Sequence, residues 1–310
     1  MLIETLQNIV PNKLKNILKP YFRLFFPNKN YALWWITFRC TYKCSYCPYC
    51  GISDYSEFFP ETCEKTGEEW IEALEKLPPT SFYFSGGEPF LYKDLPYIIN
   101  NLPEKHSVIG IVTNASMPLS IYRKIKKKIH LNVSFHREFT SETEFISKVA
   151  ELQNFFHLTV NIVATPDNLD FLKTLNKICK SNKIALHVDP FVNFAAEKPK
   201  FSKEQLQILN KFISPDRRIK KKKKLYNTTK IKKCSAGRNY YNIMPNGEIS
   251  ICSGGMDYKY SPLRSLSTNG IFNLGNVFED EIGLNKSDFV CNYPCLNHCD
   301  MDFCLIRSNN

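Results

Sequence analysis

Four of the twelve cysteines lie within one short stretch, CTYKCSYCPYC, which runs from Cys40 to Cys50. As C-x3-C-x2-C, the first three have the spacing of ligands to an iron–sulfur cluster. As C-P-Y-C, Cys47 and Cys50 form a redox dithiol of the glutaredoxin kind. As C-x2-C-x2-C, counted from Cys44, they open a ferredoxin run. That run needs a fourth cysteine followed by proline, and Asp54 stands where it is expected.

The stretch after the second β-prone run favours the first of these interpretations. A glutaredoxin needs a small domain with a cis-proline loop facing the dithiol, and the nearest candidate, Thr165-Pro166, lies far downstream. The second β-prone run instead leads straight into Ser85-Gly86-Gly87-Glu88-Pro89. Two glycines allow a ligand to approach the backbone closely. The carboxylate of Glu88 can accept hydrogen bonds from an ammonium group.

The predicted strands and helices that must position these residues alternate along the chain. Six β-prone runs occur at 31–39, 81–84, 107–113, 130–135, 157–164 and 183–189. Segments with helical spacing lie between them, such as 67–77 and 141–156, and the second opens with a Ser-Glu-Thr-Glu cap signature. Alternating strands and helices predict an α/β fold with a parallel sheet. Loops at the carboxyl ends of such strands carry active sites, and both motifs follow strands directly.

Together these motifs resemble those of the radical S-adenosylmethionine (radical SAM) superfamily. Its cysteine motif, C-x3-C-x-aromatic-C, is matched by Cys40, Cys44, Tyr46 and Cys47, and its GGE motif by 85–89. The resemblance covers about residues 31–200 and implies a partial (β/α)6 TIM-like barrel. It implies that three cysteines bind a [4Fe–4S] cluster, whose open iron is chelated by the amino and carboxylate groups of SAM. Reduction then gives methionine and a 5′-deoxyadenosyl radical that removes a hydrogen atom from the substrate.

The resemblance also implies a set of SAM-binding residues. Glu88 would receive the amino group and Tyr46 would lie near the adenine. The polar residues that end the third and fourth strands would contact the ribose and carboxylate. The expected set is Tyr46, Gly86, Gly87, Glu88, Thr113, Asn114, Ser134 and His136. The Gly-rich adenine motif of the family is not evident on the fifth strand, which reads VNIVAT at 160–165.

The last third of the chain carries a second group of cysteines. Two β-prone runs flank Asn246-Gly247, a strong hairpin signal that would bring Cys252 back toward Cys234. This arrangement resembles the opening of the SPASM and twitch domains of radical SAM enzymes, although four thiolates would also suit zinc. The resemblance implies one auxiliary [4Fe–4S] cluster, and a second is left open. The candidate ligands are Cys234, Cys252, Cys291, Cys295, Cys299 and Cys304.

We therefore expect four regions: an amphipathic extension (1–30), the radical SAM core (31–215), a Lys-rich linker (216–233) and an auxiliary iron–sulfur domain (234–310). Cys50 and Cys63 fall in the loop after the motif and are candidate hydrogen-atom donors. Cys179 lies in a helical pattern and is expected in the core.

Charge and hydropathy limit the partners. The formal net charge is +11, but no nucleic-acid-binding motif accompanies the lysine clusters, so we interpret them as a solvated face. No apolar run is long enough to span a membrane, and no secretory signal is evident. Contact of the basic amphipathic segment 2–26 with a membrane surface is an alternative to its packing on its own domain, which we favour. We expect a cytoplasmic protein, in which thiols stay reduced and clustered cysteines indicate metal or redox chemistry.

The function that follows is a radical SAM oxidoreductase or maturase that modifies an unactivated C–H bond. Its substrate would be a ribosomal peptide or a small molecule such as a sugar or aminocyclitol, and an external low-potential donor would supply electrons. Dehydrogenation, cross-linking and epimerisation all remain open as outcomes. The alternatives are a non-catalytic iron–sulfur electron carrier and a zinc-binding nucleic-acid protein.

Overall fold

The computed structural model describes residues 30–47, 49–51, 54–190, 201–212, 232–234, 236–251, 273–279, 282–284 and 289–291. Its main sheet has the strand order β10-β9-β8-β1-β2-β3-β4-β5-β6. The six strands expected from the sequence are parallel neighbours within it: β1 (Asn30–Thr37), β2 (Thr80–Gly86), β3 (Ser107–Thr113), β4 (His130–Phe135), β5 (His157–Ala164) and β6 (Ala185–Pro190). The predicted α/β class with a parallel sheet is confirmed, and it is consistent with a partial barrel.

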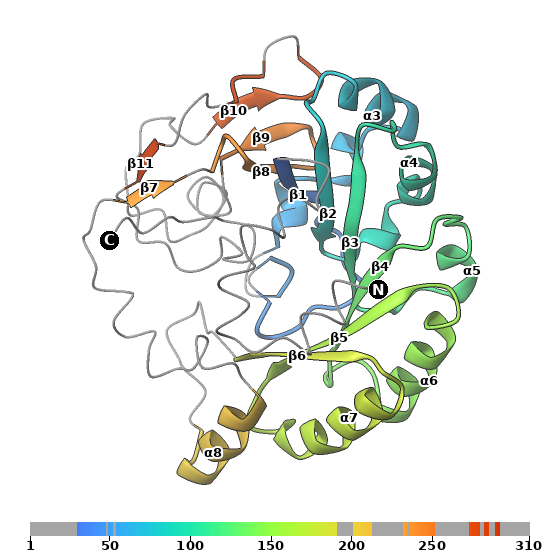
Figure 1. Ribbon diagram of the computed structural model, residues 1–310, viewed down its shortest axis with the longest axis vertical. Coiled ribbons are helices and arrows are strands. Elements are labelled where there is room, and N and C mark those ends of the chain that lie inside the picture. The colour runs from blue at the N-terminus through green and yellow to red at the C-terminus, as the bar shows by residue number, and fades with distance from the viewer. Residues whose placement is uncertain are drawn as a thin grey trace, which may run out of the picture.

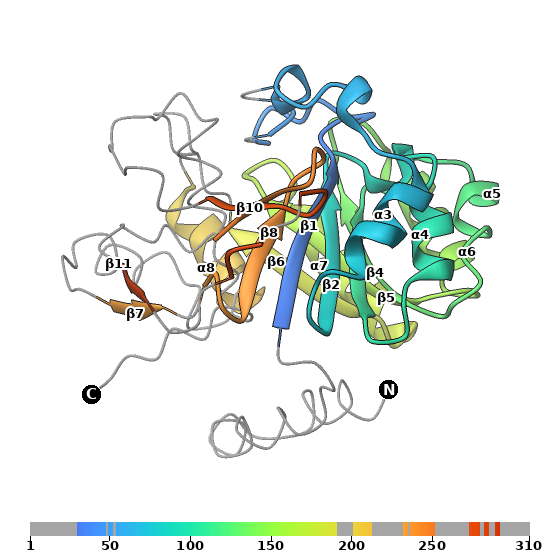
Figure 2. The same ribbon diagram turned by 90° about the horizontal axis from the view of Figure 1, so that it is seen from above.

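Helices cover the outer side of this curved sheet (Figure 1). They are α3 (Gly67–Leu74), α4 (Leu95–Asn101), α5 (Leu119–Tyr122), α6 (Glu142–Leu152), α7 (Leu169–Ser181) and α8 (Lys203–Phe212), with short 3-10 turns at Tyr55–Glu57, Glu61–Cys63 and Pro89–Leu91. The predicted cap of α6 is present as a capping box, in which the Ser141 hydroxyl accepts from the N–H of Glu144 and the Glu144 carboxylate accepts from the N–H of Ser141. In Figure 2 the blue connection after β1 lies beyond the carboxyl end of that strand.

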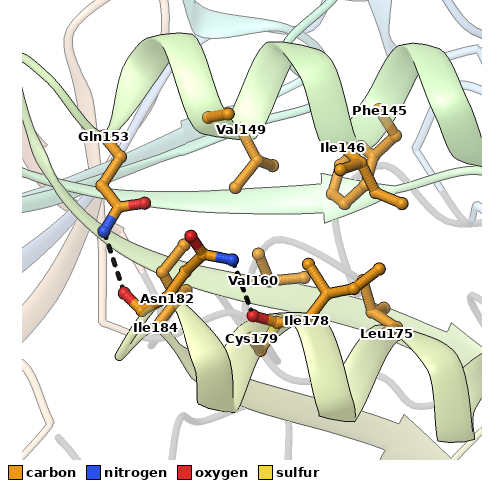
Figure 3. Close-up of a pocket in the computed structure, with 11 residues that line it drawn as sticks. Phe145, Ile146, Val149, Gln153, Val160, Leu175, Ile178, Cys179, Asn182 and Ile184 are labelled. Carbon is orange, nitrogen blue, oxygen red and sulfur yellow. Dashed lines mark hydrogen bonds between the residues drawn. The ribbon is translucent and has the colours of Figure 1, made fainter.

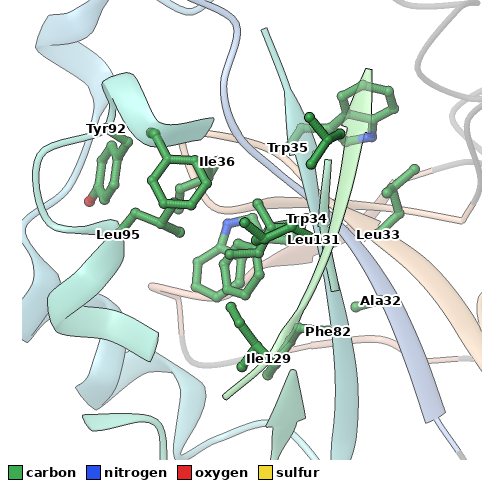
Figure 4. Close-up of a cluster of buried hydrophobic side chains, with 14 of the residues drawn as sticks. Ala32, Leu33, Trp34, Trp35, Ile36, Phe82, Tyr92, Leu95, Ile129 and Leu131 are labelled. Atoms are coloured by element: carbon green, nitrogen blue, oxygen red, sulfur yellow. The ribbon is translucent and has the colours of Figure 1, made fainter. Parts of the chain in front are cut away.

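Strand β1 runs through the middle of the hydrophobic core. Six consecutive residues, 32–37, are buried, which is typical of a parallel strand covered on both faces. Trp34 lies in the buried cluster with Phe82 and Ile36 (Figure 4). It packs edge-on against Trp70 of α3, with ring centroids 4.5 Å apart, and stacks on Phe84 of β2 at 4.9 Å. Aromatic pairs of this kind add to the stabilisation from burial. The strand that delivers Cys40 is therefore rigidly held.

The predicted hairpin at Asn246-Gly247 is confirmed. Strand β8 (Tyr240–Ile243) pairs antiparallel with β9 (Glu248–Ser250), and Gly247 has a φ of +86°, which favours glycine. Strand β10 (Asn273–Asn276) follows β9. Beyond the prediction, β8 also pairs in parallel with β1, so the hairpin extends the main sheet. Residues 1–29 of the predicted extension and 216–231 of the predicted linker lie outside the described residues.

The outer layer contains a small apolar pocket between α6 and α7 (Figure 3). Phe145 and Val149 of α6 and Leu175 of α7 are among its lining residues, and it lies away from the cysteine motif. Cys179 lines this pocket and is buried, as expected for a core residue. Among the helices that the structure describes, none has both the length and the apolar character needed to cross a membrane.

Candidate functional site

The residues after β1 wind into successive turns. The N–H of Cys47 donates to the carbonyl of Cys44 at 2.9 Å, and the N–H of Gly51 donates to the carbonyl of Cys47 at 3.2 Å. A Cβ on Gly51 would lie 1.8 Å from the carbonyl oxygen of Cys44, a distance that no side chain allows. The turns therefore fold the cysteine motif back on itself beyond the end of β1.

The thiol of Cys50 lies against two cysteines of the motif. Its S–H donates a hydrogen bond to the carbonyl oxygen of Phe38, at 3.3 Å. The hydrogen bond with Cys50 lowers the pKa of Cys47 to about 6, against the opposing effect of burial, and backbone N–H groups of residues 49–51 lower it further. The Cys50 thiol also lowers the pKa of Cys40. Thiolates are the form of cysteine that binds metal, so these two positions are prepared for ligation.

Cys44 faces strand β4 instead. Its Sγ lies 3.2 Å from Nδ1 of His136, and the residue is 4% exposed. Burial raises the pKa of Cys44 to about 12, and the nearby Cys47 and Glu138 raise it as well. This thiol will ionise at neutral pH only when a cation compensates the charge, as a bound metal does.

The donor set fits an iron–sulfur cluster better than a single ion. Within the described ranges, no three His, Cys, Asp or Glu side chains converge on one metal-sized point. A [4Fe–4S] cluster makes a different demand, because each cysteine binds a separate iron at its own corner. Three cysteines in one wound segment, two of them with lowered pKa values, meet that demand. Cys40, Cys44 and Cys47 would hold three corners and leave the fourth free.

The Gly86-Gly87 step packs directly on the segment that leads to Cys40. The N–H of Gly87 donates to the carbonyl of Thr37, and the N–H of Glu88 donates to that of Arg39, both at 2.8 Å. A Cβ on Gly87 would lie 2.2 Å from the carbonyl oxygen of Arg39. The sequence led us to expect a ligand close to these glycines. In the structure, the chain's own backbone makes the close approach, and the motif thereby fixes the position of Cys40.

Glu88 is fully buried and joins the ends of β2 and β3. Its carboxylate accepts hydrogen bonds from the Thr113 hydroxyl at 2.9 Å, from the N–H of Asn114 at 2.7 Å and from the N–H of Phe90 at 3.1 Å. Burial raises the pKa of Glu88 to about 7, although these three hydrogen bonds oppose the shift. A cation placed beside this carboxylate would favour its charged form.

The end of β3 reaches the cysteine segment through Asn114. Its Nδ2 donates to the Thr41 hydroxyl at 3.0 Å and lies 3.7 Å from Sγ of Cys40. The Thr41 hydroxyl also hydrogen-bonds with that of Ser116, at 2.7 Å. Asn114, expected in the site, is therefore brought to the first cysteine, whereas Thr113 hydrogen-bonds to Glu88 and Tyr122.

The end of β4 reaches the same segment through His136. Its Nδ1 lies 2.8 Å from the hydroxyl of Tyr46, in addition to its contact with Cys44. Burial lowers the pKa of His136 to about 4, so the ring is neutral at pH 7. Ser134 lies two residues before His136, near the end of β4. It is buried and pairs in register with Asn161 of β5. Tyr46, Ser134 and His136 thus lie along one edge of the sheet.

Several residues that the sequence did not single out hold this arrangement. The guanidinium of Arg39 forms a bidentate ion pair with Glu64, at 3.1 and 2.8 Å. The carboxylate of Glu138 accepts from both the N–H and the hydroxyl of Ser45, at 2.9 and 2.7 Å. Arg39 and Glu138 each follow a strand by two or three residues, which is the signal that could have identified them. Cys63 is half-buried beside Glu64 and packs against the hydrophobic core.

A second pair of cysteines lies on a separate two-stranded sheet. Strand β7 (Lys232–Cys234) pairs antiparallel with β11 (Phe289–Cys291), so that Cys234 lies opposite Phe289 and Cys291 lies opposite Lys232. Cys234 and Cys291 are therefore diagonal neighbours, about 7–8 Å apart in such a ladder. The other predicted ligands of an auxiliary cluster, Cys252, Cys295, Cys299 and Cys304, lie outside the described residues.

Residues 35–185 match the family model described as the Radical SAM superfamily. Among curated proteins, the chain is 26% identical over 252 residues to the PqqA peptide cyclase of Granulibacter bethesdensis, a match that covers 70% of this chain and 66% of that protein. It is 35% identical over 101 residues to the Fe-coproporphyrin III synthase of Methanosarcina barkeri, which covers 33% of this chain and 24% of the relative. The chain thus spans about two thirds of the first relative and about a quarter of the second.

Solved structures share the fold at low sequence identity. SuiB of Streptococcus suis superposes with a TM-score of 0.58 at 19% identity, over 92% of this chain and 71% of that one. The structure of anSMEcpe with bound AdoMet superposes with a TM-score of 0.52 at 14% identity, over 88% of this chain and 84% of that one. The cysteine motif at the carboxyl end of β1, the GGE motif that supports it and the family match agree, and residues 35–185 of this chain form a radical SAM superfamily domain.

Proposed function

We propose that this chain is an enzyme that reductively cleaves SAM and uses the product radical to remove a hydrogen atom from a C–H bond of its substrate. One observation carries the proposal. The segment from Arg39 to Cys47 is hydrogen-bonded to the ends of β2, β3 and β4, so the motif cysteines and polar strand-end residues share one edge of the sheet. That edge is where enzymes of this architecture bind their ligands.

Cys40, Cys44 and Cys47 would hold the cluster. When bound, the cluster supplies one electron to the sulfonium of SAM, which yields methionine and a 5′-deoxyadenosyl radical. The chain's own residues orient the reactants. Hydrogen bonds from Gly87 and Glu88 fix the backbone that delivers Cys40, and those of His136 hold the Cys44 side of the segment.

The SAM site would be built from the strand ends around the motif. Glu88 already accepts three hydrogen bonds, and an ionised carboxylate has lone pairs for one more, so it can accept one from the SAM ammonium. The remaining polar contacts would come from strand-end groups and the cysteine segment. We assign Tyr46, Thr113, Asn114, Ser134 and His136 to this role, while Gly86 and Gly87 would support it by packing on the segment that carries Cys40.

We propose a ribosomal peptide as the substrate class. The support comes from relatives: one is a PqqA peptide cyclase, and SuiB has been solved with its precursor peptide SuiA. No similar support favours a sugar or an aminocyclitol. Cys50 and Cys63 remain the candidate thiol donors for an epimerisation. Their placement, against the motif and against the core, favours dehydrogenation or cross-linking instead.

An auxiliary iron–sulfur cluster in a SPASM-like or twitch-like region is part of the proposal. The pairing of β7 with β11, which makes Cys234 and Cys291 diagonal neighbours, supports it. We also propose a low-potential external electron donor and a cytoplasmic location, where thiols stay reduced.

Anaerobic turnover tests the proposal against the alternative of a non-catalytic electron carrier. Reconstituted protein is mixed with dithionite and SAM, and 5′-deoxyadenosine and methionine are quantified. We expect both products from the wild type and from Cys179→Ala, a cysteine of the outer layer, and neither from Cys44→Ala. A carrier would yield no 5′-deoxyadenosine, and unchanged cleavage by Cys44→Ala would remove the first cluster from the mechanism.

A further inference from the structure

Tyr122 is a fully buried tyrosine next to the groups that hold Glu88, and it is the last residue of α5. Its ring packs against that of Phe90, with centroids 4.2 Å apart, and its hydroxyl oxygen lies 3.2 Å from that of Thr113. Phe90 and Thr113 supply two of the three hydrogen bonds that the carboxylate of Glu88 accepts. Tyr122 therefore contacts two of the three residues that fix this carboxylate.

The partners of the Thr113 hydroxyl set the direction of its hydrogen bonds. The hydroxyl donates to the carboxylate of Glu88 at 2.9 Å, and its oxygen accepts from the N–H of Ala115 at 3.0 Å. A hydroxyl has one proton to donate, so the Thr113 oxygen can only accept from Tyr122. The O–H of Tyr122 thus donates to Thr113, which donates to Glu88. Hydrogen bonds in such a chain strengthen one another, because each donor polarises the next.

The turn after β3 holds the Thr113 hydroxyl in place from the other side. Ala115 has a φ of +57°, a left-handed conformation that residues other than glycine rarely adopt. In this turn the N–H of Ser116 also donates to Oδ1 of Asn114, at 2.9 Å. Strained backbone of this kind persists where its surroundings determine it. The hydroxyl of Thr113 is therefore fixed between a tight turn and the phenol of Tyr122.

We propose that Tyr122 is a positioning residue that, through the Thr113 hydroxyl, orients the Glu88 carboxylate toward the ammonium group of SAM. A carboxylate already held by fixed donors need not be ordered when its ligand arrives, so less free energy is lost on binding. Without the phenol O–H, the Thr113 hydroxyl could turn away, and one oxygen of Glu88 would lose its fixed donor. The inference rests on the SAM site of the proposed function. It gives Tyr122 no contact with SAM itself.

The test is the dissociation constant of SAM, measured by equilibrium dialysis of the anaerobically reconstituted protein. Tyr122→Phe keeps the ring against Phe90 and removes only the hydroxyl. It should weaken SAM binding about two- to five-fold, the lower part of the range for one hydrogen bond, because it acts through another group. Tyr241→Phe is the matched control. The hydroxyl of this buried tyrosine bonds with that of Thr80 at 2.8 Å, at the opposite end of β2 from the GGE motif, so its loss should leave SAM binding unchanged.

Two variants of Thr113 separate positioning from packing. The effect of Tyr122→Phe should disappear in a Thr113→Val background, which has no hydroxyl to orient, and should persist in Thr113→Ser, which keeps one. An equal weakening in the Thr113→Val background would overturn the inference, because Tyr122 would then act by packing alone. If Thr113→Val binds no cluster, the comparison of Tyr122→Phe with Tyr241→Phe decides the matter.

The same measurements distinguish this inference from the proposed function. A dissociation constant in Tyr122→Phe equal to that of a SAM-binding wild type refutes only the role of Tyr122. A reconstituted wild type that binds no SAM would instead refute the proposed function.

Discussion

Gly87→Ala tests whether the GGE motif serves to hold the cysteine segment. The new Cβ would lie 2.2 Å from the carbonyl oxygen of Arg39 and 2.7 Å from that of Phe38, both backbone atoms that cannot swing aside. The β2 end must therefore move away from Cys40, with loss of its hydrogen bonds to Thr37 and Arg39. Overpacking of this kind costs about 1–3 kcal/mol. For a domain of 150–250 residues, each kcal/mol lowers Tm by about 2–4 °C.

Gly283→Ala is the matched control. Neither glycine has a positive φ, and a Cβ on Gly283 would meet its nearest neighbour, the carbonyl oxygen of Leu274, at an ordinary 3.6 Å. The assay is thermal unfolding of the cluster-free proteins by circular dichroism, with iron content measured after reconstitution. We expect Gly87→Ala to lose about 2–12 °C of Tm and to bind less iron than the control. Equal Tm and equal iron in the two variants would refute the role given to the motif.

Three further predictions follow from other contacts of the site. Glu138→Ala removes both hydrogen bonds to Ser45 and should speed iron release to a chelator about five-fold, whereas Glu142→Ala should not. Equal release rates in the two variants would contradict the role of Glu138 in holding the cysteine segment. Because burial raises the pKa of Glu88 from 4.5 to about 7, the folded chain holds this proton more tightly than the unfolded chain. Urea-unfolding stability should therefore fall as pH rises from 5 to 7, by up to about 1.4 kcal/mol per unit, and this contribution to the slope should be lost in Glu88→Gln. Cys234→Ala should lower iron content while SAM cleavage persists at least in part, and unchanged iron would rule out a cluster at β7 and β11.

The sequence predicted the parallel strands well because their signal is local. The β-prone runs at 107–113, 130–135 and 157–164 have the same bounds as β3, β4 and β5. The cap of α6 was equally readable, since its two partners lie three residues apart. Each of these signals lies within a few neighbouring residues and needs no knowledge of the tertiary structure.

The contacts that build the site were not predictable in this way. The pairing of β8 with β1 joins segments from opposite ends of the chain, and no local pattern selects that neighbour. The partner of Gly87 is backbone, which carries no sequence signature. Glu138 is an ordinary exposed acid until the fold brings it to Ser45. Motifs therefore identified which residues matter, while the fold determined what they touch.

The most direct test of this account is the EPR spectrum of the reduced, anaerobically reconstituted protein, recorded without and with SAM. Cys40, Cys44 and Cys47 leave one iron of the cluster open, so SAM should bind there and change the signal. A [4Fe–4S] signal that is identical in the two spectra would contradict the central claim.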